Sequence, residues 1–342
     1  TMSEPTGETS KRPKDTAFRQ QRLPAWHPLI TPKSVIPVFL LVAVVFVPLG
    51  IGMLVTTNAL SEYSFDYTNC AALEGGGTCA SQVAMGFQNC TCNITVTIPK
   101  TLDGTVYMYY GLTNFYQNHR RYVKSRDDVQ LTGALAAAKT CDPLTSAGGA
   151  PYAPCGLIAN SMFNDTLRLV PALGGPPIFQ KSTGIAWTSD VDTKFNNPPP
   201  SSNLTLAFAG SLQPPNWPFS PAEIGNTAGH PNGPGFKNED FIVWMRVAAL
   251  PNFRKLYRIQ ENGLQAGDYF LLVDYNFPAL NFEGTKSMIV TQSSWIGGKS
   301  AFLGVAYIVV GAICLLIGAF FILLNRIKPR ALGDPALLKW SY

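Results

Sequence analysis

The chain has 342 residues, enough for one large domain or two of ordinary size, and only 14% of them are Asp, Glu, Lys or Arg. Soluble proteins carry about 25% of these residues, so the composition argues against a wholly soluble protein. The net charge of +5 at pH 7 belongs to the two ends of the chain, because residues 56–300 contain sixteen bases and seventeen acids.

A basic tail, residues 1–34, precedes an apolar run. The tail has three acids and six bases: Lys11, Arg12, Lys14, Arg19, Arg22 and Lys33. Residues 35–57 are expected to form a transmembrane helix, because residues 35–55 carry no charge and are long enough to cross a bilayer. Pro37 and Pro48 lie inside the run, where kinks are tolerated when neighbouring groups satisfy the freed carbonyls. A cleaved signal peptide would need a leading segment of more than thirty residues, which favours a signal anchor.

Six of the seven cysteines fall in the intervening region, residues 58–300, and Cys314 falls in a second apolar run. The six are Cys70, Cys79, Cys90, Cys92, Cys141 and Cys155. An even set predicts three disulfides in an oxidising compartment, and the spacing leaves the pairing of the four clustered cysteines open. A structural zinc site fits less well, because such sites use paired C-x-x-C or Cys/His knuckles and His119 is the only nearby histidine.

Four N-glycosylation sequons lie in the same region, and none lies in the tails. Their acceptors are Asn89, Asn93, Asn164 and Asn203. One sequon alone carries little weight, but four in one region agree with the cysteines in placing residues 58–300 in the lumen or outside the cell. Asn89 has the poorest context, because Cys90 lies inside its sequon.

The stretch NFYQNHRRYVKS, residues 114–125, mixes bases and aromatic residues as surfaces that bind single-stranded nucleic acid do. No nucleic acid is expected on the luminal side of a membrane, so this partner is excluded. Four aromatic or aliphatic residues and one histidine recur at spacings of three and four, which predicts a short amphipathic helix packed on a sheet: Phe115, Tyr116, His119, Tyr122 and Val123. Its bases then face solvent or acidic partners: Arg120, Arg121, Lys124 and Arg126.

Short segments rich in β-branched and aromatic residues predict an antiparallel β-sandwich. They are CNITVTI from Cys92, TVYMYY from Thr105, LTLAFA from Leu204, YFLLVDY from Tyr269 and SMIVTQ from Ser287. Between residues 143 and 235, Pro and Gly supply 26 of 93 residues, a composition also found in disordered segments. Interleaved aromatic residues favour ordered long loops there: Phe163, Phe179, Trp187, Phe195, Phe208, Trp217 and Phe219.

Catalytic patterns are sparse. The chain has three histidines, no G-x-S-x-G elbow and no H-E-x-x-H. Two carboxylates flank one residue in DVD, and Asp190 and Asp192 would suit a divalent ion and a nucleotide-sugar diphosphate in a glycosyltransferase. Three residues are a weak match, and glycosyltransferases generally have one membrane helix, so a solvated loop is the expectation. Neither catalysis nor a cofactor is expected.

Residues 301–325 are expected to form a second transmembrane helix, and residues 326–342 a basic tail with four bases and one acid. By the positive-inside rule both tails are cytosolic. Gly304, Gly311 and Gly318 recur every seven residues and form a smooth stripe on which another backbone can pack closely. We expect a partner's membrane helix there. The alternatives are that glycines are simply common in membrane helices and that the chain's own first helix uses the stripe, through Gly50 and Gly52.

Six blocks of the sequence resemble, in order and nearly end to end, the signature blocks of the cell-division-cycle protein 50 family, also called the ligand-effect-modulator family. Blocks of this length are more specific than the short motifs above, and they favour a fungal member. They are FRQQRLPAWHP (18–28), NFYQNHRRYVKS (114–125), PCGLIANSMFNDT (154–166), GIAWTSD (184–190), NEDFIVWMRVAALPNFRKLYR (238–258) and SSWIGGKSAFLGVAYIVVG (293–311).

The resemblance implies a non-catalytic β-subunit, bound one-to-one to a type IV P-type ATPase that moves phospholipid to the cytosolic leaflet. It implies a two-helix anchor in the bilayer, a glycosylated luminal β-rich domain, and passage from the endoplasmic reticulum to the Golgi, endosomes or plasma membrane. It also implies nested disulfides, with Cys70–Cys92 outside Cys79–Cys90, plus Cys141–Cys155. Asn164, inside the block FNDT, becomes the first glycan site, followed by Asn93 and Asn203.

Two other classes stay open. A stand-alone luminal receptor or adhesion glycoprotein would share the glycans and disulfides but would need no basic, Trp-containing cytosolic segment. A luminal glycosyltransferase would need a metal at Asp190 and Asp192. Purification in mild detergent separates the three, because only the subunit brings a large ATPase with it.

Overall fold

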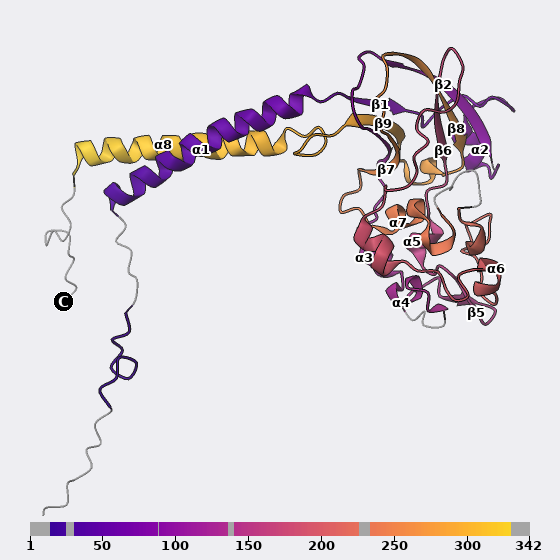
Figure 1. Cartoon of the computed structure of the whole chain (residues 1–342), viewed down its shortest axis with the longest axis horizontal. Helices are drawn as coiled ribbons and strands as arrows, with labels where there is room; N and C mark the ends of the chain where they lie inside the picture. The colour runs from indigo at the N-terminus through magenta and orange to yellow at the C-terminus, as the bar shows by residue number, and fades with distance from the viewer. Residues whose placement is uncertain (1–13, 25–30, 88, 136–139, 226–232, 330–342) are drawn as a thin grey trace, which may run out of the picture. The chain divides into compact units, whose positions relative to one another are not determined.

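The computed structural model of the protein describes residues 14–24, 31–87, 89–135, 140–225 and 233–329 (Figure 1). They belong to two compact units, a helical pair and a second unit, Leu54–Ala301, called the β domain below. Most of both expected cytosolic tails, including part of the block at 18–28, lies outside the described residues.

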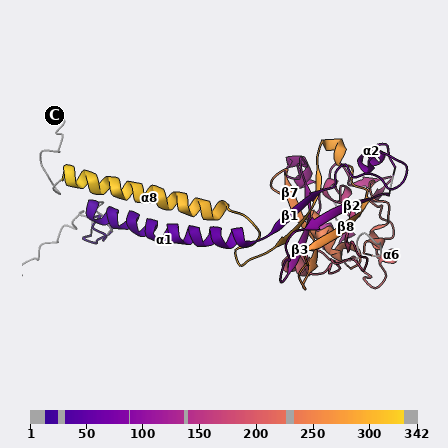
Figure 2. The same ribbon diagram turned by 90° about the horizontal axis from the view of Figure 1, so that it is seen from above.

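The helical pair consists of α1 (Pro32–Ala59) and α8 (Phe302–Ile327), which run side by side (Figures 1 and 2). They overlap the spans 35–57 and 301–325 expected from the sequence. At about 1.5 Å per residue, the 26 residues of α8 extend over about 39 Å, more than the roughly 30 Å of a hydrocarbon core. Both helices are long and apolar enough to cross a membrane, so the chain is a two-pass membrane protein.

Two antiparallel sheets build the β domain. The first has the strand order β1 (Glu62–Asp66), β9 (Lys286–Gln292), β3 (Val106–Leu112) and β7 (Phe253–Gln260). The second has the order β2 (Cys90–Ile98), β8 (Gly267–Tyr275) and β6 (Thr166–Pro171). A small ribbon pairs β4 (Ser146–Ala147) with β5 (Ala150–Pro151). The predicted antiparallel, mainly β domain between two membrane helices is confirmed.

Alternating burial explains why these segments form strands. In β2 the buried residues alternate with exposed ones, so that one face packs inward while the other meets solvent. The register sets Cys90 opposite Tyr275 and Ile98 opposite Gly267. Both sheets contribute to one hydrophobic core, and the Leu167 N–H of β6 donates to the Tyr257 hydroxyl of β7 at 3.2 Å.

Short helices and long loops cover the sheets. The α-helices are α2 (Cys79–Ala84), α3 (Arg120–Lys124), α4 (Asp128–Leu131), α5 (Leu157–Asn160), α6 (Leu204–Ala207) and α7 (Glu239–Met245). The π-helix η2 spans Asp190–Lys194, and 3-10 turns span Pro221–Glu223 (η3), Gly235–Lys237 (η4) and Ala279–Phe282 (η5). The loops are ordered through their aromatic residues, since Phe179, Phe195, Phe208 and Trp217 are buried. Trp187 differs, because 65% of it is exposed.

The strand predicted from Leu204 is wrong, because residues 204–207 form the single turn α6. Asn203 precedes them in an extended conformation, and its side-chain oxygen accepts the Leu206 N–H. An asparagine that caps a helix offers the backbone a local hydrogen bond, and here that bond outweighs the β-branched composition. The other four predicted strands correspond to β2, β3, β8 and β9.

A basic cleft as the candidate functional site

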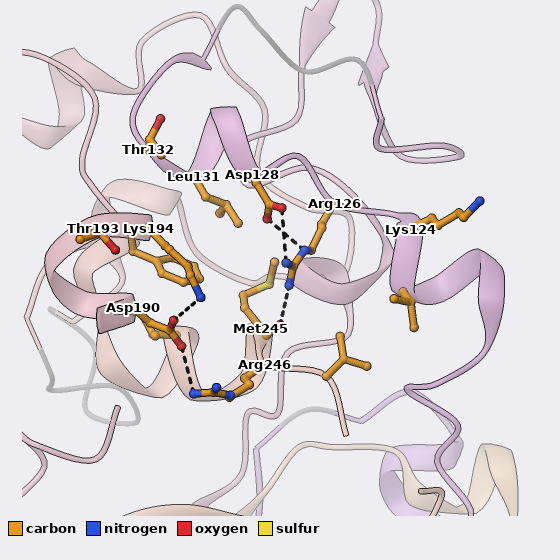
Figure 3. Close-up of a pocket in the computed structure, with 14 residues that line it drawn as sticks. Lys124, Arg126, Asp128, Leu131, Thr132, Asp190, Thr193, Lys194, Met245 and Arg246 are labelled. Carbon is orange, nitrogen blue, oxygen red and sulfur yellow. Dashed lines mark hydrogen bonds and ion pairs between the residues drawn. The ribbon is translucent and has the colours of Figure 1, made fainter. Parts of the chain in front are cut away.

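Three segments far apart in the sequence meet at a cleft of about 740 Å³ in the β domain (Figure 3). Its walls are residues 123–132, the π-helix η2 and the end of α7. An adjoining hollow of about 400 Å³ shares Asp190 and Arg246 with it. Three of the six blocks that carry the sequence resemblance, 114–125, 184–190 and 238–258, contribute residues here, so we take the cleft as the candidate functional site.

The first wall is held against α5. The Tyr122 hydroxyl lies 2.7 Å from Ser161 Oγ, and Ser125 Oγ accepts the Leu157 N–H at 2.9 Å. Gly156, the residue before α5, has φ +95°, and any Cβ there would collide with the Ser125 carbonyl oxygen. Glycine is therefore required at this close approach. The predicted amphipathic helix is shorter than expected, because Phe115 lies before α3, in a cluster of aromatic rings.

The second wall, α7, is fixed at both ends. The Asn238 side chain accepts the Phe241 N–H at 3.0 Å and so caps the helix. At the other end, Lys255 Nζ donates to the carbonyl oxygens of Val243, Trp244 and Arg246 at 2.7–2.9 Å, satisfying groups that a helix end leaves free. Burial lowers the pKa of Lys255 well below its ordinary value. The end of α7, where Arg246 enters the cleft, is thereby held in place.

Asp190 lines the cleft and is held by two bases, Lys194 and Arg246 (Figure 3). Its carboxylate, whose side chain is 7% exposed, lies 2.6 Å from Lys194 Nζ and 3.4 Å from a guanidinium nitrogen of Arg246. The same guanidinium stacks 4.1 Å from the centre of the exposed Trp187 ring, a cation–π arrangement. The cleft and the adjoining hollow together therefore present an ammonium (Lys194), a guanidinium (Arg246) and, on the side of the hollow, the Trp187 ring.

This arrangement corrects the prediction made from DVD. Asp190 is not part of a solvated loop, and its two oxygens bind bases; Asp192 is exposed. Among the residues that the structure describes, the one group with metal-ligand spacing is Cys70, Cys79 and Cys92. All three are in disulfides, so the group offers no thiolate for a metal.

Exposed bases lie along α3, whose last residue, Lys124, lines the cleft. Arg120, Arg121 and Lys124 are exposed, as predicted, and form no ion pair with any residue in the described ranges. Arg126 is half-buried instead: it pairs with Asp128 at 3.0 Å and donates to the Met245 carbonyl oxygen at 3.2 Å. Among the described residues no ion pair offsets the positive charge of α3, and such charge attracts acidic groups.

Buried ion pairs lie in the framework behind the cleft. Arg258 of β7 is 2.7 Å from Asp240 of α7, and both are under 10% exposed. Burial raises the pKa of Asp240 to about 6, against the opposing effect of Arg258. The sequence does not predict these ion pairs, because the alternation of apolar and polar residues along a strand assigns charged residues to the solvent-facing side.

A second buried pair joins β9 to the loop before β6. Lys286 Nζ lies 2.5 Å from Asp165 Oδ2, and both side chains are fully buried. The Tyr67 hydroxyl donates to the same carboxylate at 3.1 Å, and the backbone N–H of Phe277 donates to Oδ1 at 2.7 Å. Burial lowers the pKa of Lys286 to about 8. Asp165 is the middle residue of the Asn164 sequon, so that sequon is rigidly held.

The cysteines form three pairs in the structure. Cys70 bonds to Cys92, Cys79 to Cys90 and Cys141 to Cys155, which is the nested arrangement that the resemblance implies. The nested pair ties α2 to β2, and the third bridge closes the loop behind α4. Cys314, in α8, is free.

The four sequon asparagines occupy different surroundings. Asn89, Asn93 and Asn203 are exposed, whereas Asn164 is half-buried. Asn93 lies on the outer face of β2. Asn203, the cap of α6, keeps its side-chain oxygen engaged. None of the four belongs to the cleft.

The glycine stripe is covered by the chain's own first helix. Gly304, Gly311 and Gly318 are buried in α8. A Cβ on Gly311 would lie 2.7 Å from Val47 Cγ2, and one on Gly50 would lie 2.8 Å from the Gly304 carbonyl oxygen. The structure therefore brings the stripe against α1, the alternative to a partner's helix, because small residues let α1 approach closely. Gly52 takes no part, since a Cβ there meets nothing within 4 Å.

Comparison with known proteins gives relatives along nearly the whole chain. Cell cycle control protein 50A of Mus musculus is 46% identical over 332 residues, which cover 93% of this chain and 90% of that protein. Cell cycle control protein 50B of Homo sapiens is 44% identical, covering 92% and 93%. ALA-interacting subunit 3 of Arabidopsis thaliana is 40% identical, covering 98% and 92%.

The family model of the LEM3 (ligand-effect modulator 3) family / CDC50 family matches residues 53–331. The matched stretch includes the whole β domain with its cleft, and it includes α8. The chain therefore belongs to the LEM3/CDC50 family.

Proposed function

We propose that the protein is the non-catalytic β-subunit of a type IV P-type ATPase that moves phospholipid to the cytosolic leaflet, bound to it one-to-one. The observation that carries the proposal is membership of the family over residues 53–331, with relatives that include interacting subunits by name. The described site agrees with a binding role, because the cleft and the adjoining hollow hold bases and an aromatic ring, and the Asp190 carboxylate is already paired with two bases.

The β domain, in this proposal, lies in the lumen and the two tails lie in the cytosol. Six cysteines in three bridges and four sequons support a luminal domain, and a net charge of +3 on each tail supports cytosolic ends. The complex assembles in the endoplasmic reticulum and works in the Golgi, endosomes or plasma membrane.

The subunit acts by binding. A ligand shifts a conformational equilibrium only through different affinities for its states, so the β domain promotes turnover by preferring some conformations of the pump. A domain held by disulfides and buried ion pairs is suited to this role, because little ordering remains to be done on association. Binding also stabilises the folded pump during assembly by mass action.

The cleft is the proposed contact with the pump's luminal loops. The uncompensated bases of α3 and the exposed Trp187 supply the charge and the apolar anchor that interfaces favour. A glycosyltransferase is disfavoured, because its metal would need Asp190, whose oxygens bind Lys194 and Arg246.

Removal of the subunit from its own cells tests the proposal. We expect an ATPase that stays in the endoplasmic reticulum and a loss of uptake of fluorescent phospholipid into the cytosolic leaflet. The full chain should restore both, and a chain carrying only the two helices and tails should restore neither. Normal export and uptake without the subunit would contradict the proposed function.

A further inference from the structure

A second cavity, of about 970 Å³, lies outside the cleft and has two sequon asparagines in its wall, Asn89 and Asn164. Asn276 connects them: its side-chain oxygen accepts the Asn89 N–H at 2.9 Å, and its side-chain nitrogen donates to the Asn164 carbonyl oxygen at 3.4 Å. An N-linked sugar on Asn164 would therefore start in the wall of a cavity, which is not the usual surroundings of a surface glycan.

The lining suits a carbohydrate. Aromatic rings from four parts of the chain face it, among them Phe87, Trp217 and Phe219, and carboxamides lie between them, as at Asn216 and Asn281. Sugar rings place their C–H faces on aromatic rings, and their hydroxyls pair with carboxamides, which both donate and accept hydrogen bonds. The volume is at the upper end of the roughly 300–1,000 Å³ of small-molecule sites, enough for more than one sugar ring.

Asn164 itself has an unsatisfied acceptor. Its side-chain oxygen is buried and has no hydrogen-bond partner among the described residues. A buried acceptor without a donor costs about 1–3 kcal/mol, so such an atom calls for a ligand or water. The residue cannot turn away, because Phe163 and Asp165 on either side are buried and Asp165 is bound to Lys286.

We infer that this cavity is the seat of the N-acetylglucosamine core of an N-linked glycan carried by Asn164. The glycan packs against the aromatic wall as part of the folded domain. This inference rests on the luminal placement of the β domain, but it does not need the ATPase. The exposed Asn93 and Asn203 carry ordinary glycans that extend into solvent.

An endoglycosidase that cleaves between the first two N-acetylglucosamine residues tests whether the Asn164 glycan occupies the cavity. The full chain is produced in a eukaryotic host with high-mannose glycans, digested natively in mild detergent, and followed by mass spectrometry at each asparagine. Because cleavage of a seated core requires the glycan to leave the cavity first, we expect trimming at Asn164 to be at least about tenfold slower than at Asn93 and Asn203. Denaturation should abolish the difference.

Two variants show whether the cavity protects the Asn164 glycan from the endoglycosidase. Phe87 is 60% exposed and lines the cavity, whereas Met85, 69% exposed, does not. Phe87→Ala should accelerate trimming at Asn164 several-fold, and Met85→Ala should leave it unchanged.

Equal trimming rates at Asn164, Asn93 and Asn203 in the native protein would overturn the inference, as would folded protein in which Asn164 is unmodified while Asn93 and Asn203 carry glycans. Absence of glycan from all the sequons would instead contradict the luminal placement, and with it both proposals. Slow trimming at Asn164 that Phe87→Ala and Met85→Ala change equally would also count against the cavity.

Discussion

Lys286 shows how much a single buried charge contributes to this domain. Its ammonium is fully buried between Asp165 and the Tyr275 ring, whose centre is 2.9 Å from Nζ. Replacement by methionine keeps the length of the side chain but leaves the Asp165 carboxylate uncompensated. We expect Lys286→Met to lower the free energy of unfolding by about 3–5 kcal/mol, the usual cost of breaking a buried pair from one side.

Lys181→Met is the matched control for the loss of stability expected of Lys286→Met. Lys181 pairs with Glu261, but the two side chains are 44% and 59% exposed. Surface pairs contribute at most about 1 kcal/mol. Chemical unfolding of the full chain in detergent measures both variants, and equal losses would contradict the account of the buried pair.

Asp240 gives the domain a predictable pH dependence. Burial raises its folded-state pKa to about 6, above the ordinary value of 3.8. Between these values the folded state binds more protons than the unfolded state, so the contribution of Asp240 to stability is full below about pH 4 and is lost as the pH rises through about 6. The stability of the wild type minus that of Asp240→Asn should therefore fall between pH 4 and 6. Unfolding of both proteins across this range checks the sign; a rising difference would contradict it.

Packing between α1 and α8 depends on small residues at defined positions. A Cβ on Gly311 would lie 3.2 Å from the Val47 backbone nitrogen, so the clash is with the main chain as well as with the side chain. Gly311→Leu should separate the helices while leaving insertion and the three disulfides intact. Gly52→Leu is the control, because its neighbourhood is open.

Crosslinking between the two helices measures this effect. The rings of Phe39 and Phe321 lie 6.1 Å apart, so Phe39→Cys with Phe321→Cys, in a Cys314→Ala background, should crosslink efficiently. We expect Gly311→Leu to reduce the yield several-fold and Gly52→Leu to leave it unchanged. Undiminished crosslinking in Gly311→Leu would show that the stripe is not the contact.

The helix α3 carries the charge proposed to meet the pump. Reversal of two exposed bases, Arg120→Glu with Arg121→Glu, should lower recovery of the ATPase with the subunit by at least about tenfold, because like charges opposed across an interface cost several kcal/mol. Lys100→Glu, exposed between β2 and β3, should have no effect. Quantitative pull-down from detergent measures both. Equal recovery in the two variants would place the contact elsewhere.

Local patterns predicted the longer apolar elements and missed the short strands β1 and β6 as well as β7. Strands β2, β3, β8 and β9 have apolar or β-branched runs and were predicted, as were the two membrane helices. Strand β7 was missed because its Lys255 and Arg258 look like solvent-facing residues, although both are buried with partners from α7. The strand predicted for residues 204–207 is a helical turn, because the Asn203 side chain caps it. A capping hydrogen bond cannot be read from the composition of the segment.

The candidate site was less predictable than the fold, because it depends on residues brought together from distant segments. The bases of α3 and the DVD carboxylates each drew attention in the sequence. Nothing in the sequence, however, places Asp190 between Lys194 and Arg246, or Trp187 against that guanidinium. The blocks of family resemblance pointed to the cleft indirectly, because three of the six contribute residues to it.

At the scale of the whole molecule, the protein combines a two-helix anchor with a domain stiffened by three disulfides and by buried ion pairs. Each unit has its own packing. The stripe that a partner helix would find easiest to use is already covered within the anchor, which leaves the β domain as the main proposed surface for the ATPase.

Purification of the tagged full chain from its own membranes, in a detergent mild enough to preserve membrane complexes, tests the central claim most directly. We expect a P-type ATPase present one-to-one with the subunit, whose ATP hydrolysis rises on addition of phospholipid. Recovery of the intact, disulfide-bonded chain without any ATPase would contradict it.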